Sequence, residues 1–174
     1  MKLTLSTTRL TLRPWEINDA PMMFSGWANS NEVTKYLTWS PHTDVRQTEF
    51  LLKLWVSQYE KPERINFAIE EKSTGTLIGG IDVVGYIDGI PVIGYVLRED
   101  RWGKGYMTEA CKEVLRYLFS LGHKAVRIDA DEDNIGSNRV IQKCDGVFQR
   151  KLQDEVKGQT RTINIYHVFN PDAK

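Results

Sequence analysis

The residues whose types and spacing most clearly suggest chemistry lie between Arg98 and Thr108. Gly103 and Gly105 flank Lys104 at the point where an apolar stretch gives way to a long amphipathic one. Glycine has no Cβ, so it allows backbone N–H groups to approach an anion closely. The first N–H groups of a helix lack partners and carry partial positive charge, which favours phosphate. Residues 103–108 therefore predict a phosphate cradle, to which Lys104 adds a cation and Thr108 a hydroxyl.

This cradle differs from the two best-known nucleotide-binding loops. The Walker pattern, Gly-x-x-x-x-Gly-Lys followed by Ser or Thr, does not occur in the chain. The Gly-x-Gly-x-x-Gly pattern fails as well, because the residue three positions after Gly105 is Thr108. A plain strand-to-helix turn would also use two glycines, for geometry alone. The position between a buried strand and a helix favours the phosphate interpretation.

The elements that position the cradle can be read from the apolar spacing. Residues 91–98 are apolar on both faces, which is typical of a central strand in a covered sheet. Residues 104–121 have helical spacing, and Gly122 follows where a helix end favours a left-handed residue. The residues expected on the buried face of this helix are Met107, Ala110, Cys111, Val114, Leu115 and Leu118.

The whole pattern predicts a mixed α/β single domain over residues 1–174. Further strands are expected at residues 9–15, 66–70, 76–84, 124–130, 147–152 and 162–169. Further helices are expected from Asn18 or Asp19 to about residue 27, and at residues 32–37, 43–59 and 134–143. Thr43 is the expected cap of the third of these helices. Its expected buried face consists of Phe50, Leu51, Leu54 and Trp55.

Composition excludes several classes of function. The chain has 23 basic and 23 acidic residues, so no overall field favours nucleic acid. The two cysteines, Cys111 and Cys144, lack metal-site spacing and are expected to be buried free thiols, with no metal site. The first nine residues lack the apolar core of a signal peptide, and no stretch approaches the roughly 18 apolar residues of a membrane span. A cytoplasmic location without membrane contact is expected.

Four segments together resemble the GNAT superfamily of acetyltransferases, especially its RimJ/RimL-like branch of ribosomal-protein N-terminal acetyltransferases. Residues 95–110 resemble motif A, and the others are residues 8–15, 76–80 and 134–143. The resemblance implies a GNAT fold: a mostly antiparallel, twisted sheet of about seven strands flanked by helices. It also implies a V-shaped splay between the fourth and fifth strands, residues 91–98 and 124–130. The implied cofactor is acetyl-CoA, and the implied activity is acyl transfer to an amine.

The resemblance also assigns the cofactor contacts. The pantetheine arm is expected to pair with the backbone of Val96 and Leu97, as an added strand does. The pyrophosphate is expected on the N–H groups of the cradle, and Asn134 and Ser137 are expected to contact the cofactor from the second cofactor helix. Local capping is an alternative role for both. The remaining expected contacts are Trp102, Gly103, Lys104, Gly105, Tyr106, Met107 and Thr108.

Acid and base are less clearly marked. Many GNAT enzymes place a tyrosine seven residues after the asparagine as the acid that protonates the leaving thiolate. Here that residue is Ile141, so Ser137 is the expected substitute. Asp82 is the expected base, acting directly or through water, although it could also be a solvent-facing strand carboxylate. On the acceptor side, Trp39 is the expected wall of the pocket.

The missing strong base favours an acceptor that loses its proton easily. A peptide α-amine titrates near pH 7.7 to 8.0 and a lysine side chain near 10.4. The favoured acceptor is therefore the N-terminus of a peptide or protein. It is expected to attack acetyl-CoA directly in a ternary complex. Three alternatives stay open: acetylation of a small-molecule amine, a CoA-binding module without turnover, and a generic nucleotide-binding protein. The branch resemblance also implies a homodimer as an option.

Overall fold

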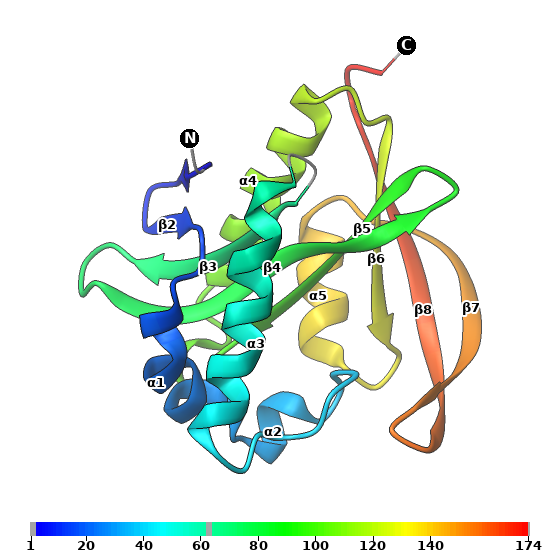
Figure 1. Ribbon diagram of the computed structural model, residues 1–174. Helices are drawn as coiled ribbons and strands as arrows, with labels where there is room; N and C mark the ends of the chain where they lie inside the picture. The colour runs from blue at the N-terminus through cyan, green and yellow to red at the C-terminus, as the bar shows by residue number, and fades with distance from the viewer. Residues whose placement is uncertain (1–2, 62–63, 174) are drawn as a thin grey trace.

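The computed structural model describes residues 3–61 and 64–173, in which a single eight-stranded sheet separates two groups of helices (Figure 1). The order of the strands is β1-β2-β3-β4-β5-β6-β8-β7. The mixed, mostly antiparallel fold predicted from the sequence is confirmed. The described part contains one strand more than expected, because the two residues of β1 (Leu5–Ser6) pair with β2 (Leu10–Arg13).

The central strands explain the splay. β3 (Asn66–Glu71), β4 (Thr76–Ile87) and β5 (Ile90–Leu97) form an antiparallel meander. β5 then meets β6 (Ala125–Asp131) in parallel, and within the described residues they pair only at Val92–Arg127 and Ile93–Ile128. Beyond Ile93 the two strands diverge, so the V-shaped splay lies where it was predicted. β8 (Gln159–Phe169) continues the sheet from β6, and β7 (Val147–Val156) forms its outer edge.

Two glycines of β4, Gly79 and Gly80, lie where a side chain would collide with neighbouring atoms. A Cβ on Gly79 would lie 2.3 Å from the carbonyl oxygen of Val96 on β5. A Cβ on Gly80 would lie 2.7 Å from the ring of Trp15. The close contact of β4 with β5 on one side and with the indole of Trp15 on the other therefore requires residues without side chains.

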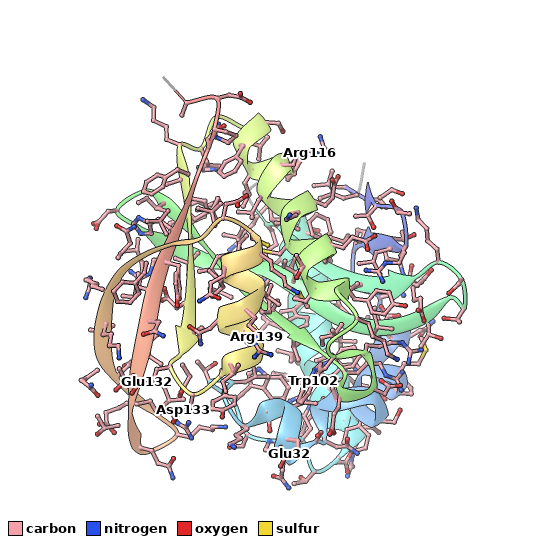
Figure 2. All side chains as sticks on the ribbon, turned by 180° about the vertical axis from the view of Figure 1, so that it is seen from behind. Glu32, Trp102, Arg116, Glu132, Asp133 and Arg139 are labelled. Atoms are coloured by element: carbon pink, nitrogen blue, oxygen red, sulfur yellow. The ribbon has the colours of Figure 1, made fainter. Side chains whose placement is uncertain are left out.

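One face of the sheet is covered by α4 (Tyr106–Ser120) and α5 (Ile135–Lys143), which lie in front when the molecule is seen from behind (Figure 2). All six residues predicted for the inner face of α4 are buried in the larger core. Gly122 follows α4 with φ of 94°, the left-handed conformation expected of it. Periodicity thus predicted this layer correctly.

The opposite face carries α1 (Ala20–Met23), α2 (Asn31–Thr34) and α3 (Val45–Ser57) over a smaller core around Trp15 and Trp27 (Figure 1). Asp19, one of the two expected N-caps, occupies the N-cap position of α1, although its side chain makes no cap hydrogen bond. A 3-10 turn at Ile17–Asp19 comes first, because the Asp19 carboxylate turns back and accepts the Glu16 N–H at 2.9 Å. A π-helical turn, Phe24–Ala28, extends α1.

Two expectations for α3 were wrong. Its cap is Asp44, whose carboxylate accepts the Arg46 N–H at 2.8 Å, while Thr43 donates its N–H to Gln47. Phe50 is 73% exposed, whereas Leu52 is completely buried. Leu54 is exposed as well, whereas Leu51 and Trp55 of the expected face pack on the smaller core as predicted. The apolar residues of α3 are spread over two adjacent stripes. The stripe that contains Leu52 packs on the tryptophans of the smaller core and is therefore the buried one.

None of the helices in the described part of the chain is long and apolar enough to cross a membrane.

Candidate functional site

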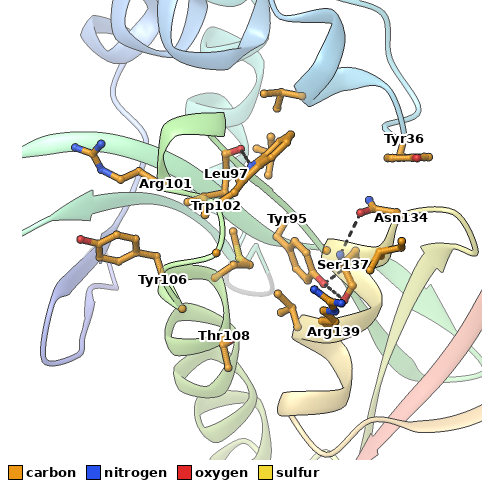
Figure 3. Close-up of a pocket in the computed structure, with 18 of the residues that line it drawn as sticks. Tyr36, Tyr95, Leu97, Arg101, Trp102, Tyr106, Thr108, Asn134, Ser137 and Arg139 are labelled. Atoms are coloured by element: carbon orange, nitrogen blue, oxygen red, sulfur yellow. Dashed lines mark hydrogen bonds between the residues drawn. The ribbon is translucent and has the colours of Figure 1, made fainter.

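A cavity of about 590 Å³ opens where β5 leaves β6. Its walls are the end of β5, the start of α4, the start of α5, and α2 with the loop that follows it (Figure 3). Most residues predicted to hold a cofactor are brought together here. They are Val96, Leu97, Trp102, Gly103, Gly105, Tyr106, Met107, Thr108, Asn134 and Ser137.

The diverging end of β5 forms one wall. Val96 and Leu97 pair with Gly80 and Gly79 of β4 on one side, and the pairing with β6 on the other side has already ended. The indole N–H of Trp102 donates to the carbonyl oxygen of Leu97 at 2.8 Å. Trp102 thereby fixes the end of β5 to the loop that precedes α4.

The phosphate cradle has the backbone that its glycines predict. Gly103 and Gly105 have φ of 72° and 79°, a left-handed region that L side chains rarely adopt. A Cβ on Gly103 would meet no described atom within 4 Å, so the loop is open beside it. Gly105 directly precedes α4, whose first N–H groups therefore face the loop.

Lys104 does not lie where it was expected. Lys104 is not among the described residues that line the cavity. Its ammonium instead donates to the carbonyl oxygen of Asp100 at 2.9 Å. Cations reach the cavity from other elements instead: Lys35, Arg101, Arg139 and Lys143. Arg139 and Lys143 are four residues apart on α5 and so share a helix face, a spacing that sequence reasoning could have used. Arg139, Trp102 and Glu32, which are labelled in Figure 2, line the cavity from three different segments.

Ser137 lies in the first turn of α5. Its N–H donates to the side-chain oxygen of Asn134 at 3.1 Å, so the capping role of Asn134 is present and Asn134 still lines the cavity. The Ser137 hydroxyl hydrogen-bonds the Tyr95 hydroxyl at 2.8 Å (Figure 3). Burial raises the pKa of Tyr95. Tyr95 lines the cavity and also packs on the larger core.

Asp82 lies on the opposite face of the sheet from Ser137. It pairs with Gly94 in the β4–β5 register, and its Oδ1 lies 3.7 Å from where a Gly94 Cβ would be. Successive residues of a strand face opposite sides, so Gly94 faces Asp82 while Tyr95 faces Ser137. Asp82 is therefore outside the lining of the cavity as described, but adjacent to the splay.

The environment of Asp82 is unusual for a strand carboxylate. Burial raises the pKa of Asp82 to about 6, although Arg64, whose Nη2 lies 3.3 Å from Oδ2, acts in the opposite direction. A carboxylate with this pKa is ionised at neutral pH and can still take up a proton readily. The expectation of a freely solvated carboxylate does not fit this burial.

Contacts between distant segments join the elements near α2 and the start of α5, on one side of the cavity. Lys157, at the turn between β7 and β8, donates to the carbonyl oxygen of Thr34 at 2.7 Å. The Tyr36 hydroxyl donates to the carbonyl oxygen of Asp133 at 3.2 Å, and the Arg161 guanidinium lies over the Tyr36 ring. Tyr36 rather than Trp39 lines the cavity within the described ranges.

Trp39 was expected as a pocket wall, and this expectation was wrong. It stacks against His42 at 5.2 Å between ring centroids and packs on the smaller core. His42 in turn contacts the Thr48 hydroxyl through Nδ1 at 2.7 Å. Both residues therefore stabilise the loop before α3. Cys111 and Cys144 are buried free thiols, as predicted.

Comparison with known proteins identifies the family and the fold of the chain. The model of the acetyltransferase (GNAT) domain family matches residues 9–147, most of the chain. The chain belongs to the GNAT acetyltransferase family. A relative of this acetyltransferase, "Uncharacterized N-acetyltransferase p20" of Bacillus licheniformis, is 31% identical over 94% of this chain and 93% of its own.

Solved structures share the fold of this GNAT acetyltransferase. RimL, a ribosomal L7/L12 alpha-N-protein acetyltransferase in complex with coenzyme A, superposes with a TM-score of 0.84 at 18% identity, covering 96% of this chain and 98% of its own. The microcin C7 self-immunity acetyltransferase MccE, in complex with acetyl-CoA and AMP, has a TM-score of 0.83 at 20% identity, covering 94% of each chain.

The residues of the cavity fit the acetyl-CoA that this family implies. The backbone of β5 at Val96 and Leu97 is free of β6, and the open side of Gly103 has no Cβ to block an anion. The Nε of Arg101 is buried without a partner among the described atoms. Arg101 is one of the four cationic residues named above that line the cavity. A buried guanidinium N–H without a partner is costly unless a ligand or water accepts it.

Proposed function

We propose that this GNAT protein transfers an acetyl group from acetyl-CoA to the α-amine at the N-terminus of a peptide or protein. The observation that carries the proposal is the cavity at the splay, which is lined by the phosphate cradle, by α2 with the loop that follows it, and by the start of α5. RimL, whose name describes α-N-protein acetylation, shares the fold and supports the choice of acceptor.

The proposed cofactor contacts follow from the lining of the cavity. Val96 and Leu97 would pair with the pantetheine amides, because their backbone has lost its neighbour on the β6 side. Residues 103–108 would hold the pyrophosphate through their N–H groups. Arg139 and Lys143 on α5 supply positive charge for the phosphates, and Asn134 orients the first turn of that helix.

The acid and the base are proposed on opposite faces of β5. Acetyl-CoA supplies an acetyl group activated as a thioester. Ser137, held by the Tyr95 hydroxyl at 2.8 Å, is the proposed hydrogen-bond donor to the sulfur on the α5 face. Asp82, with a pKa raised to about 6, is the proposed base that takes the ammonium proton from the acceptor, directly or through water.

The joined segments beside the cavity support a chain end as the substrate. The contacts of Lys157 with Thr34 and of Tyr36 with Asp133 join the β7–β8 turn, α2 and the start of α5. An internal lysine needs chain to leave the site in two directions, whereas an N-terminus needs only one. Segments joined beside the cavity leave less room for a second chain direction, which favours an acceptor that enters end-on.

A matched peptide pair tests this proposal. One peptide has a free N-terminus and no lysine; the other has a blocked N-terminus and one internal lysine. Release of free thiol from acetyl-CoA measures turnover, and we expect the first peptide to be the better substrate. CoA should also raise the melting temperature, since it binds only the folded state.

Other outcomes would identify other functions. A preference for the internal lysine or for polyamines would overturn the assignment to N-terminal amines. Thermal stabilisation by CoA with no thiol release across the amine panel would indicate a CoA-binding module. Stabilisation by ATP instead of CoA would contradict the cofactor assignment.

A further inference from the structure

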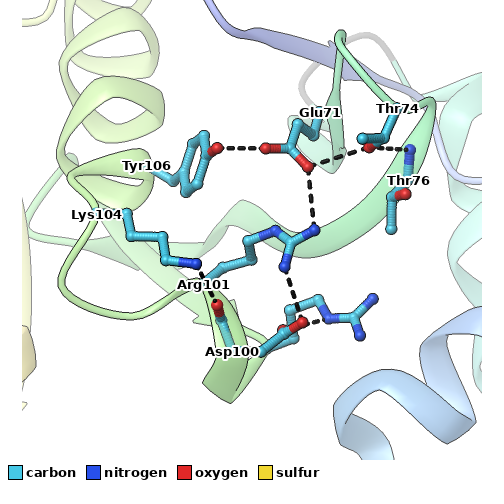
Figure 4. Close-up of polar contacts among 8 residues, drawn as sticks. Glu71, Thr74, Thr76, Asp100, Arg101, Lys104 and Tyr106 are labelled. Atoms are coloured by element: carbon cyan, nitrogen blue, oxygen red, sulfur yellow. Dashed lines mark hydrogen bonds and ion pairs between the residues drawn. The ribbon is translucent and has the colours of Figure 1, made fainter.

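A single buried carboxylate outside the cavity holds both ends of the phosphate cradle. Glu71, the last residue of β3, is 7% exposed and accepts hydrogen bonds from three side chains (Figure 4). Its Oε2 accepts from the Thr74 hydroxyl at 3.0 Å and from Nη2 of Arg101 at 3.2 Å. Its Oε1 accepts from the Tyr106 hydroxyl.

The positions of two of these donors are informative. Arg101 ends the 3-10 turn before the cradle, and Tyr106 begins α4. The four residues between them include both left-handed glycines. Glycine-containing loops have more backbone freedom than others, so fixing the two ends limits the shapes that the loop adopts. Glu71 fixes both ends from one point.

A second carboxylate supports the outer side of the same loop. Arg9 donates through Nη1 to the carbonyl oxygen of Lys104 at 3.0 Å, and its guanidinium lies 4.3 Å from the centroid of the Tyr106 ring. Glu109 holds Arg9 by a 2.6 Å ion pair. Tyr106 thus lies between Arg9 and Glu71, which restricts its movement.

Arg101 connects Glu71 to the cavity. It lines the cavity, and its Nε is buried without a partner among the described atoms, whereas Nη1 and Nη2 are bound to Asp100 and Glu71. The ion pairs set the plane of the guanidinium before any ligand arrives. Preorganised donors bind an anion more tightly because the ordering cost is already met in the free protein.

We propose that Glu71 is a positioning residue for the diphosphate of coenzyme A, acting through Arg101 and Tyr106 without touching the ligand. The inference rests on the proposed use of acetyl-CoA. It assigns a part of the affinity for the cofactor to the end of β3. This strand lies outside residues 95–110 and 134–143, the two GNAT-like segments that line the cavity. The effect should be confined to ligands that carry the diphosphate.

The test is the Glu71→Gln variant, with Glu70→Gln as the matched control. Glu70 is the neighbouring carboxylate and also pairs with an arginine, Arg13 at 2.9 Å, but faces the other side of the sheet. We expect the dissociation constant of CoA, from titration calorimetry, to rise at least tenfold in Glu71→Gln and to stay within twofold in Glu70→Gln.

A donor without phosphate separates positioning from general damage. S-acetylpantetheine carries the thioester and the arm but no diphosphate, so its kcat/KM should be equal in wild type and Glu71→Gln. Equal losses with both donors would overturn the inference, and so would unchanged CoA binding. Tyr106→Phe, which removes one of the three donors, should show the same pattern to a smaller extent even if Glu71→Gln does not fold. Wild-type protein that fails to bind CoA would instead overturn the proposed function on which the inference rests.

Discussion

The two sides of the cavity are built differently. The side proposed for the cofactor is formed by residues within one short segment, 95–108, and by the first turns of α5. The side proposed for the acceptor is assembled from segments far apart in the chain: the Lys157–Thr34 contact spans 123 residues, and the Tyr36–Asp133 contact spans 97. Geometry made by neighbouring residues can be predicted from their types, whereas geometry made by distant residues depends on the whole fold.

The largest effect is expected at Asp82, the proposed base on the opposite face of the sheet from Ser137. Asp82→Asn keeps the shape but cannot take a proton, so kcat/KM should fall by roughly 10² to 10⁴. In wild type the rate should fall as the pH drops through about 6, because the raised pKa leaves the carboxylate protonated below that value. The Asp82→Asn variant should not show this fall in rate at low pH.

The control for Asp82 is Asp88→Asn, the same change at the turn after β4 where φ is 52°. Asparagine tolerates this left-handed conformation, so the control should keep its activity. Unchanged kcat/KM in Asp82→Asn, measured with a true acceptor, would remove the residue from the mechanism.

The packing of α3 on the smaller core, away from the cavity lining, can be tested by stability. Leu52 is completely buried and Phe50 is 73% exposed, although both are apolar residues of α3. Leu52→Ala should lower the free energy of unfolding by about 2 to 5 kcal/mol, and Phe50→Ala should change it by less than about 0.5 kcal/mol. Urea denaturation measures both. Equal losses would mean that α3 presents a different face to the sheet.

On the cofactor side, Ser137→Ala should lower kcat by about 10², the smaller end of the range for a lost acid, since a thiol with a pKa near 8.5 leaves without much help. CoA affinity should not change. Ser120→Ala, at the far end of α4, is the control. A kcat equal to that of wild type would show that no donor at residue 137 is needed.

The smallest effect is expected within the cradle. Gly105→Val should weaken CoA binding by about tenfold, which corresponds to about 1.4 kcal/mol. Gly75→Val is the matched control, because its φ is 65°, close to the 79° of Gly105, and it lies in a turn outside the described cavity lining. Both variants share the backbone strain of valine at positive φ. Equal CoA binding by the two would make Gly105 a turn residue only.

What could be predicted from the sequence follows the same division. The inner face of α4 was correct at all six positions, because one helix against one sheet leaves a single apolar stripe. The cap at Asn134 and the left-handed residue at Gly122 were also correct, since each depends on its own turn. The cofactor side of the cavity followed from such local rules.

The errors share a different cause. Lys104 was expected to face the phosphate, but the carbonyl oxygen of Asp100 binds its ammonium and Arg101 reaches the cavity instead. Arg101 is held there by Glu71, 30 residues earlier in the chain. Trp39 and Tyr36 are equally plausible walls by residue type, and only the position of the β7–β8 hairpin decides between them. No spacing within either segment carries that information.

The short pairing between β5 and β6 has a consequence for association with other chains. Residues 94–97 of β5 form a strand edge inside the molecule, where the ladder with β6 has ended. A strand edge on an outer surface can template the addition of strands from other molecules and so promote aggregation. This edge lies between α4 and α5, in a cavity lined by side chains from both. A sheet from another protein cannot reach it, whereas a single slender chain of amides can.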